Sequence, residues 1–207
     1  MLTYEQLLDR DLDWALREGS MHFEGASAVH KTLRRIADRL EELGVDYAIA
    51  GGMALFFHGY RRFTEDVDVL VTPAGLETIH ANLEGLGYVK PFEKSKNLRD
   101  AETGVKIDFL VSGQYPGDGK PGPVAFPDPD DAATEVDGIR VLGVESIVQL
   151  KLASGKESHR VGDLNDVQKL IEVLKLPRGF ADRLDPSLRD AFLAKWNDAQ
   201  KAGADDM

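Results

Sequence analysis

Two acidic residues alternate with valines in residues 66–71, whose sequence is DVDVLV. β-branched residues favour strands, and residues i and i+2 of a strand project from the same face. We therefore predict a strand whose Asp66 and Asp68 point to one side while its valines point to a core on the other. Two close carboxylates repel each other unless a cation lies between them, and Mg²⁺ prefers oxygen ligands. For this motif alone, a half-exposed strand that shows its acids to water is the simpler alternative.

A second predicted strand carries a third carboxylate. In residues 105–111 the apolar side chains at 105, 107, 109 and 111 share one face, and Asp108 lies on the other. If the two strands are neighbours, Asp108 joins Asp66 and Asp68. Three carboxylates on one sheet face can hold two ions about 3.5–4 Å apart, the separation used for in-line phosphoryl transfer. We therefore predict these acids to be catalytic residues and ligands of two Mg²⁺ ions, with Mn²⁺ as an alternative, and Asp108 to be a candidate general base.

A pair of glycines, Gly51 and Gly52, lies between a predicted strand and a predicted helix. Glycines allow close approach to the backbone, and the start of a helix offers free N–H groups to phosphate. The pair is therefore a candidate phosphate-binding turn. Taken alone, a tight turn without a ligand is the commoner meaning of such a pair.

Apolar spacing and helix-breaking residues outline the other elements. We predict helices over residues 3–17, 26–43, 53–58, 75–86, 144–154, 163–175 and 186–202. Strands are predicted over 47–50, 66–71, 88–92, 97–101, 105–111 and 139–142, with loops over 18–25 and 112–129. This order indicates an α+β fold with a mixed β-sheet flanked by helices. The predicted domains are an α/β core with N-terminal helices, residues 1–143, and a helical C-terminal lobe, residues 144–207.

Composition excludes several functions. Lys and Arg total 25 and Asp and Glu total 36, which gives a net charge of −11 and argues against a protein that coats DNA by charge alone. The chain has no cysteine, which excludes disulfides and thiol nucleophiles. We see no signal peptide and no apolar run of the roughly 18 residues that a membrane helix needs. We therefore expect a cytoplasmic protein without a membrane partner.

The glycine pair and the acids together resemble the signature of the DNA polymerase β-like nucleotidyltransferase superfamily. That signature is a hydrophobic residue and Gly-Gly or Gly-Ser, then a spacer, then Asp-x-Asp, with a third acid on a later strand. The matching segments here are 49–52 and 66–69, thirteen residues separating Gly52 from Asp66, with Asp108 as the third acid. The fuller string from Gly51 to Asp68 resembles the AbiEii-type branch, which includes toxin-type nucleotidyltransferases of bacterial toxin–antitoxin and phage-defence systems. The resemblance covers about residues 30–175.

The resemblance implies a nucleotidyltransferase-type fold and adds nucleotide-binding residues. Thr64 shares a strand face with Asp66 if the strand extends back. An arginine suits phosphate, and the resemblance favours Arg62 over its neighbour for that role. Members of the branch also carry a downstream Lys and an Asp-Leu-x-Asp-Val stretch, which correspond here to Lys151 and to residues 163–167. Lys151 would bind a phosphate oxygen, or else it lies at the solvent-exposed edge of its helix. Asp163 would orient Lys151, or else it is the N-cap of a helix beginning at residue 164.

The predicted function is a Mg²⁺-dependent nucleotidyltransferase that binds an NTP and transfers its nucleoside monophosphate to an acceptor hydroxyl, releasing pyrophosphate. By resemblance the acceptor is a tRNA 3′ end, another RNA, a protein side chain or a small molecule, and a cognate antitoxin is a possible partner. One alternative is a regulator with the same fold that binds a nucleotide but does not catalyse a reaction. Another is an antitoxin-like interaction protein.

Two features depart from the pattern. Gly52 replaces the Ser common in the superfamily, which removes one hydroxyl contact to phosphate. The segment 112–129 contains five Pro and four Gly and does not map onto the family. We interpret it as a passive surface loop, with a role in acceptor choice as the alternative.

Overall fold

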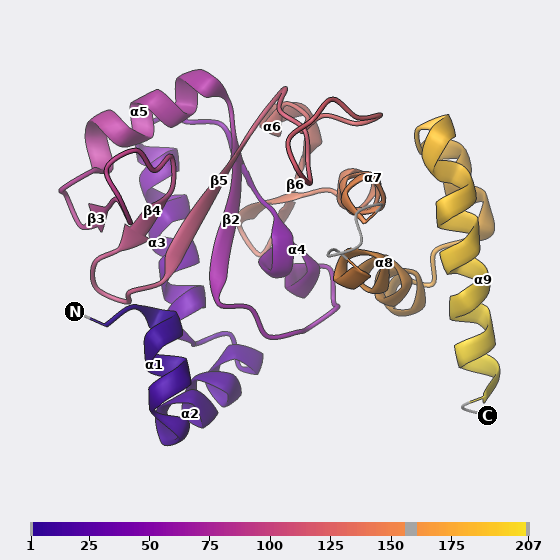
Figure 1. Ribbon diagram of the computed structural model, residues 1–207, viewed down its shortest axis with the longest axis horizontal. Coiled ribbons are helices and arrows are strands. Elements are labelled where there is room, and N and C mark those ends of the chain that lie inside the picture. Colours follow the sequence, from indigo (N-terminus) through magenta and orange to yellow (C-terminus); the bar gives the residue numbers. More distant parts are fainter. Residues whose placement is uncertain (1, 156–160, 206–207) are drawn as a thin grey trace.

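The computed structural model describes residues 2–155 and 161–205, in which seven strands form one mixed sheet with helices on both sides (Figure 1). The strand order is β3-β4-β5-β2-β1-β7-β6. The strands are β1 (Tyr47–Ile49), β2 (Asp66–Val71), β3 (Tyr88–Val89), β4 (Leu98–Asp100), β5 (Lys106–Val111), β6 (Ala133–Val136) and β7 (Ile139–Leu142). The predicted α+β fold is thus confirmed, and β2, which carries the acid pair, lies at the centre of the sheet.

Helices cover both faces of this sheet. They are α1 (Tyr4–Arg10), α2 (Leu12–Phe23), α3 (Ala28–Glu42), α4 (Gly51–Phe57), α5 (Pro73–Leu83), α6 (Pro129–Ala132), α7 (Val144–Ser154), α8 (Val161–Leu174) and α9 (Arg189–Asp205), with the 3₁₀ helices η1 (Arg178–Arg183) and η2 (Pro186–Leu188) before α9. Figure 1 shows α3 and α5 on one side of β2 and β5, and α4, α7, α8 and α9 on the other. The predicted division at residue 143 stays a prediction.

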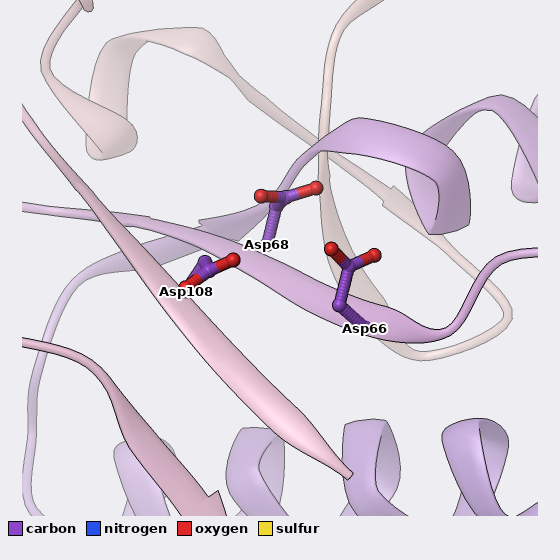
Figure 2. Close-up of side chains that lie close together, drawn as sticks. All are labelled: Asp66, Asp68 and Asp108. Carbon is purple, nitrogen blue, oxygen red and sulfur yellow. The ribbon is translucent and has the colours of Figure 1, made fainter. Parts of the chain in front are cut away.

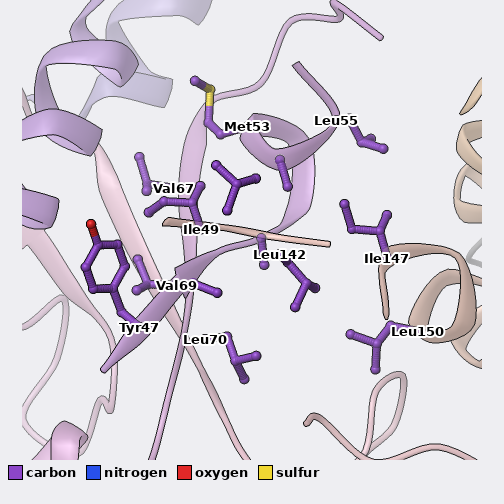
Figure 3. Packing of buried hydrophobic residues seen from close by; sticks show 14 of the residues in the cluster. Tyr47, Ile49, Met53, Leu55, Val67, Val69, Leu70, Leu142, Ile147 and Leu150 are labelled. Carbon is purple, nitrogen blue, oxygen red and sulfur yellow. The ribbon is translucent and has the colours of Figure 1, made fainter. Parts of the chain in front are cut away.

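The predicted two-faced pattern of β2 is present. Val67, Val69 and Val71 are fully buried, whereas Asp66 and Asp68 are half-buried on the opposite face. The apolar stripe predicted along α3 is buried as well, which fixes that helix against the valine side. Figure 3 shows part of this core, including Val67 and Val69. One face of β2 is therefore sealed by packing, and the other is left for chemistry.

The predictions for the N-terminus were partly wrong. The helix expected over residues 3–17 is two helices, because the side chain of Asp11 accepts a hydrogen bond from the backbone N–H of Trp14 and so begins α2. The loop expected over 18–25 is mostly helix, since α2 continues to Phe23. Glu18 explains the continuation: its carboxylate accepts from the Tyr4 hydroxyl at 3.1 Å and from the backbone N–H of Ala28 at 2.9 Å. These two contacts tie α2 to its neighbours.

Strand β6 is missing from the sequence-based prediction. It pairs antiparallel with β7 through a tight turn in which Asp137 has φ 51° and Gly138 has φ 74°. Asp-Gly is a common pair in two-residue hairpin turns with this backbone conformation. The dipeptide was therefore the available signal for this hairpin.

No helix in the described ranges combines the length and the apolar character that crossing a bilayer requires.

Two buried histidines join the N-terminal helices to the loop before β2. His22 on α2 donates from Nε2 to the carbonyl oxygen of Arg62 at 3.0 Å. The ring of His30 on α3 lies 4.9 Å from that of His22, and its Nδ1 is 3.0 Å from the hydroxyl oxygen of Ser27. Burial lowers the pKa of His22, and burial, His22 and Arg34 together lower that of His30 to about 4. Both rings are therefore packed as neutral groups.

Acidification below about pH 6.5 should destabilise the fold through these histidines. The histidines of the unfolded chain bind a proton more readily than the buried rings do. The stability that the two neutral rings contribute to the fold is therefore complete above pH 6.5, and it is lost as the pH falls toward the folded-state pKa of His30, about 4. His30 contributes a slope of at most roughly 1.4 kcal/mol per pH unit in this window, and His22 acts in the same direction. Urea unfolding between about pH 7 and 5 should give a shallower pH dependence for His30→Gln than for the wild type. Parallel curves would contradict this expectation.

Candidate active site

Three carboxylates from two neighbouring strands form the centre of the site. Strands β2 and β5 pair in parallel, and Asp68 is the direct partner of Asp108 in that register. Carboxylate oxygens of Asp66, Asp68 and Asp108 lie within 4.8 Å of one another. Figure 2 shows all three side chains on the same side of the two strands. The predicted meeting of the three acids on one sheet face is therefore observed, while their catalytic roles stay predictions.

The electrostatics of this cluster favour a cation. Burial, followed by the charges of Asp66 and Asp108, raises the pKa of Asp68 to about 7, although Lys151 and Lys106 act in the opposite direction. Among the described residues, no ion pair reaches Asp66 or Asp68. Oxygen ligands that repel one another and lack a basic partner fit a divalent ion.

Asp108 is held by two residues that the sequence reasoning missed. Asn97 donates from Nδ2 to its Oδ1, and Lys106 donates from Nζ to its Oδ2 at 2.8 Å. The Asn97 amide oxygen also accepts from the backbone N–H of Phe109 at 3.0 Å, which fixes the amide orientation. Lys106 is two residues before Asp108 on the same strand, so the alternation of the strand was a usable signal for it. Asn97 precedes β4, and only the tertiary fold brings it to this place.

Both glycines of the predicted phosphate-binding turn are required by close packing. Gly51 has φ +56°, and a Cβ there would lie 1.7 Å from Oδ2 of Asp68. A Cβ on Gly52 would lie 2.7 Å from the hydroxyl oxygen of Thr64, which itself donates to Oδ1 of Asp66 at 2.8 Å. The glycines therefore bring the backbone directly against the acids. Among the described residues no side chain caps the first N–H groups of α4, which begins at Gly51.

A second charged cluster links the loop before β2 to α7 and α8. Lys151 contacts Oδ1 of Asp163 and Oδ2 of Asp166, both at 2.7 Å. Arg62 lies beside Asp166 as well, with Nε 3.2 Å from Oδ1 and Nη2 3.2 Å from Oδ2. Ser154 donates to Oδ2 of Asp163 at 2.7 Å. The predicted contact between Asp163 and Lys151 is present, and the N-cap alternative for Asp163 is wrong because α8 begins two residues earlier.

Asp166 is the residue of this cluster that the sequence-based list of site residues lacks. It is 6% exposed and is shared by Lys151 and Arg62. Its signal was the spacing of three residues after Asp163, which places both acids on one side of a helix. Arg61 behaves differently from Arg62: its guanidinium lies over the ring of Phe56, 5.4 Å from the centroid.

These groups surround a cavity of about 750 Å³. Its lining includes the predicted residues Gly51, Gly52, Arg62, Thr64, Asp66, Asp68, Lys151 and Asp163. Asp108 borders the same acids from β5 but is outside the lining found in the described part of the chain. The segment 112–129, interpreted above as a passive surface loop, supplies residues 114–119 and Phe126 to the lining. That interpretation is therefore corrected, because the loop forms a wall of the site.

Several solved structures are similar to this chain. The chain is similar to ANT(2″)-Ia in its complex with adenylyl-2″-tobramycin, with a TM-score of 0.53 and 16% identity, over 80% of this chain and 97% of that one. A solution structure of ANT(2″)-Ia gives a TM-score of 0.48 and 15% identity over 83% and 94% of the two chains. An antigenic nucleotidyltransferase-like protein from Paracoccidioides brasiliensis gives a TM-score of 0.45 and 16% identity, over 68% of this chain and 74% of that one.

Sequence comparison adds nothing to these likenesses, because no protein-family model and no curated sequence matches the chain. The likeness to ANT(2″)-Ia in its tobramycin complex shows that the chain has a nucleotidyltransferase-type fold. The fold therefore agrees with the superfamily resemblance found in the sequence.

Proposed function

We propose that this protein is a nucleotidyltransferase that transfers a nucleoside monophosphate from an NTP to an acceptor hydroxyl. One observation carries the proposal: carboxylates of Asp66, Asp68 and Asp108 converge within 4.8 Å beside a glycine turn. A cavity large enough for a nucleotide opens over two of them. The nucleotidyltransferase-type fold supports the same chemistry.

The acid cluster fits the divalent ions that this chemistry uses. Asp66 and Asp68 would hold two Mg²⁺ ions, or Mn²⁺, and Asp108 would complete the ligand set. When bound, the ions supply neutralisation of the triphosphate and of the charge that develops on the attacking and leaving oxygens. Thr64 orients the carboxylate of Asp66 by donating to its Oδ1.

The remaining charged residues would bind the triphosphate. Lys151 lies in the cavity wall and is fixed by Asp163 and Asp166, so its ammonium is already in place for a phosphate oxygen. Arg62 is fixed by the same Asp166. Backbone N–H groups at Gly51 and Gly52 would add further donors at the start of α4.

Asp108 would act on the acceptor. Its carboxylate stands at the side of the cluster that faces β4, where Asn97 and Lys106 hold both of its oxygens. As general base it would take the proton of the acceptor hydroxyl, whose oxygen then attacks the α-phosphorus as pyrophosphate leaves. Lys106 must release Oδ2 for this step, because its ammonium occupies that oxygen in the structure.

Two likenesses favour different classes of acceptor. The AbiEii-type resemblance favours a tRNA 3′ end or a protein and a toxin–antitoxin or phage-defence setting, whereas the ANT(2″)-Ia complex contains an adenylylated small molecule. Basic residues near β3 and β4 give limited support for RNA, since Lys90 pairs with Glu84 and Arg99 pairs with Glu5. A nucleotide-binding regulator and an antitoxin-like interaction protein are the alternatives, and neither needs three convergent acids.

Pyrophosphate release tests the proposal against both alternatives. The protein is incubated with each NTP, Mg²⁺ and a panel of total RNA, aminoglycosides and candidate proteins, and calorimetry measures NTP binding in parallel. We expect NTP binding and acceptor-dependent pyrophosphate release with at least one class. Binding without release across the panel would favour the regulator, and the absence of both would favour the interaction protein.

A further inference from the structure

The loop between β5 and α6 is anchored to the sheet at both of its ends. Residues 112–127 are here called the pocket loop. At its start, the backbone N–H of Ser112 donates to the carbonyl of Val71 at the end of β2, at 2.9 Å. Two further backbone hydrogen bonds close its base: Gly113 N–H to Phe126 O at 2.9 Å and Phe126 N–H to Gln114 O at 2.7 Å. The loop is thus held next to the strands that carry the acids.

Apolar residues line the part of the cavity next to this loop. Leu110 lies two residues after Asp108 on the same face of β5, so it is about 7 Å further along the strand toward the loop. Phe126, at the base of the loop, packs against the main hydrophobic core. Leu142, Ile147 and Leu150 are further apolar lining residues, and Ala50 and Phe63 line the cavity beside the glycine turn and Arg62. Figure 3 shows Ile147 and Leu150 reaching from α7 toward Leu142.

The cavity therefore changes character along its length. At one end are Asp66, Asp68, Lys151 and the glycine turn, which suit phosphate and cations. Leu110 of β5, Leu142 of β7, Ile147 and Leu150 of α7 and Phe126 of the loop form an apolar part of the lining, beside the loop's polar Gln114 and Asp118. A triphosphate bound at the charged end would place its nucleoside against the apolar end, because nothing else in a nucleotide matches such a surface.

One aromatic side chain of the pocket loop faces this end of the cavity. Tyr115 is half-buried and belongs to the cavity lining. Its ring is backed by the returning limb of the loop, since a Cβ built on Gly122 would lie 3.9 Å from Tyr115 Cδ1. A ring supported from behind and open to a cavity can stack on a planar ligand.

We propose that the pocket loop forms the nucleobase end of the site, with Tyr115 as the residue that stacks on the base. This inference rests on the function proposed above and extends it to a specific part of the substrate. The contact tolerates all four bases, because every base has a π-face on which an aromatic ring can stack. The loop's polar lining side chains, Gln114 and Asp118, are exposed and do not enclose a base edge.

Calorimetry in Mg²⁺ with ATP, GTP, CTP, UTP and inorganic tripolyphosphate tests the inference. Tripolyphosphate engages only the charged end, so it reports whether that end is intact. We expect Tyr115→Ala to weaken all four nucleotides by about tenfold or more and to leave tripolyphosphate affinity within about twofold. Tyr115→Phe should keep wild-type affinity, since it keeps the ring. Lys94→Ala, an exposed change outside the cavity lining, should have no effect.

Different results separate this inference from the proposed function. Nucleotide affinities of Tyr115→Ala equal to those of the wild type would overturn the stacking role alone. An equal loss for nucleotides and tripolyphosphate would also overturn it, because the loop would then act on the charged end. A loss of affinity for only one of the four nucleotides would overturn the inference that the contact tolerates all bases. Failure of the wild-type protein to bind any nucleotide would overturn the proposed function and this inference together.

Discussion

Replacing Asp68 by Asn should abolish nucleotidyl transfer while the protein stays folded. The substitution keeps the shape of the side chain but removes one of three convergent charges. Transfer should fall by at least about 10³-fold, since metal-held charge stabilisation contributes several kcal/mol to such reactions. In metal-free buffer near pH 8 the same variant should melt at a higher temperature, because burial, followed by the charges of Asp66 and Asp108, opposes ionisation of Asp68 and raises its pKa to about 7.

The matched control is Asp38→Asn, which removes an exposed carboxylate from α3. It should change neither turnover nor melting temperature. Circular dichroism confirms that both variants are folded, and Mn²⁺ titration followed by its paramagnetic resonance signal measures ion binding directly. Turnover of Asp68→Asn within about tenfold of wild type would remove this residue from the catalytic cluster.

Gly51→Ala should damage stability and activity together. The residue has φ +56°, which costs a side-chain-bearing residue roughly 1 kcal/mol, and the new Cβ would lie 1.7 Å from Oδ2 of Asp68. Either the turn or the carboxylate must move, and an overpacked site of this kind costs typically about 1–3 kcal/mol more. We expect a clear fall in melting temperature and at least about a hundredfold loss of transfer, because the displaced carboxylate no longer meets Asp66 and Asp108.

Gly44→Ala separates the clash from backbone strain. Gly44 has φ +63°, and an added Cβ there would meet no heavy atom within 4 Å. The Gly44→Ala variant should therefore lose only the stability that backbone strain costs, and its turnover should be normal. Adding Asp68→Ala to Gly51→Ala should recover part of the lost stability, because it removes the atoms that the new Cβ meets. Equal destabilisation by Gly44→Ala and Gly51→Ala would show that Gly51 is not constrained by the acid.

Much of the fold could be predicted because the spacing of apolar residues, alternating in strands and every three or four residues in helices, is a local signal. Strand β2 has the predicted bounds, β5 begins one residue later than predicted, and α7 matches its predicted range. The errors arose where single side chains decided the structure. Asp11 divides one expected helix in two, and the carboxylate of Glu18 holds a helix where a loop was expected.

The candidate site could be predicted only where its residues are close in sequence or matched a known signature. Asp66, Asp68 and the glycine pair were accessible in that way, and Asp108 followed from strand alternation once a neighbouring strand was assumed. Asp166 was missed although its spacing from Asp163 was a signal, whereas Asn97 could not be found, because only long-range folding brings it beside Asp108. The role of the loop after β5 could not be found either, because its composition resembles that of any exposed loop.

Insertions and deletions should be tolerated very unequally along this chain. Asp68 meets Asp108 only through the one-to-one register of β2 and β5, and a slip of one residue turns every side chain of a strand to the opposite face. Length variation among natural relatives should therefore gather in the turns of the connecting segment, residues 72–105. A single-codon deletion within either strand should behave as a null allele.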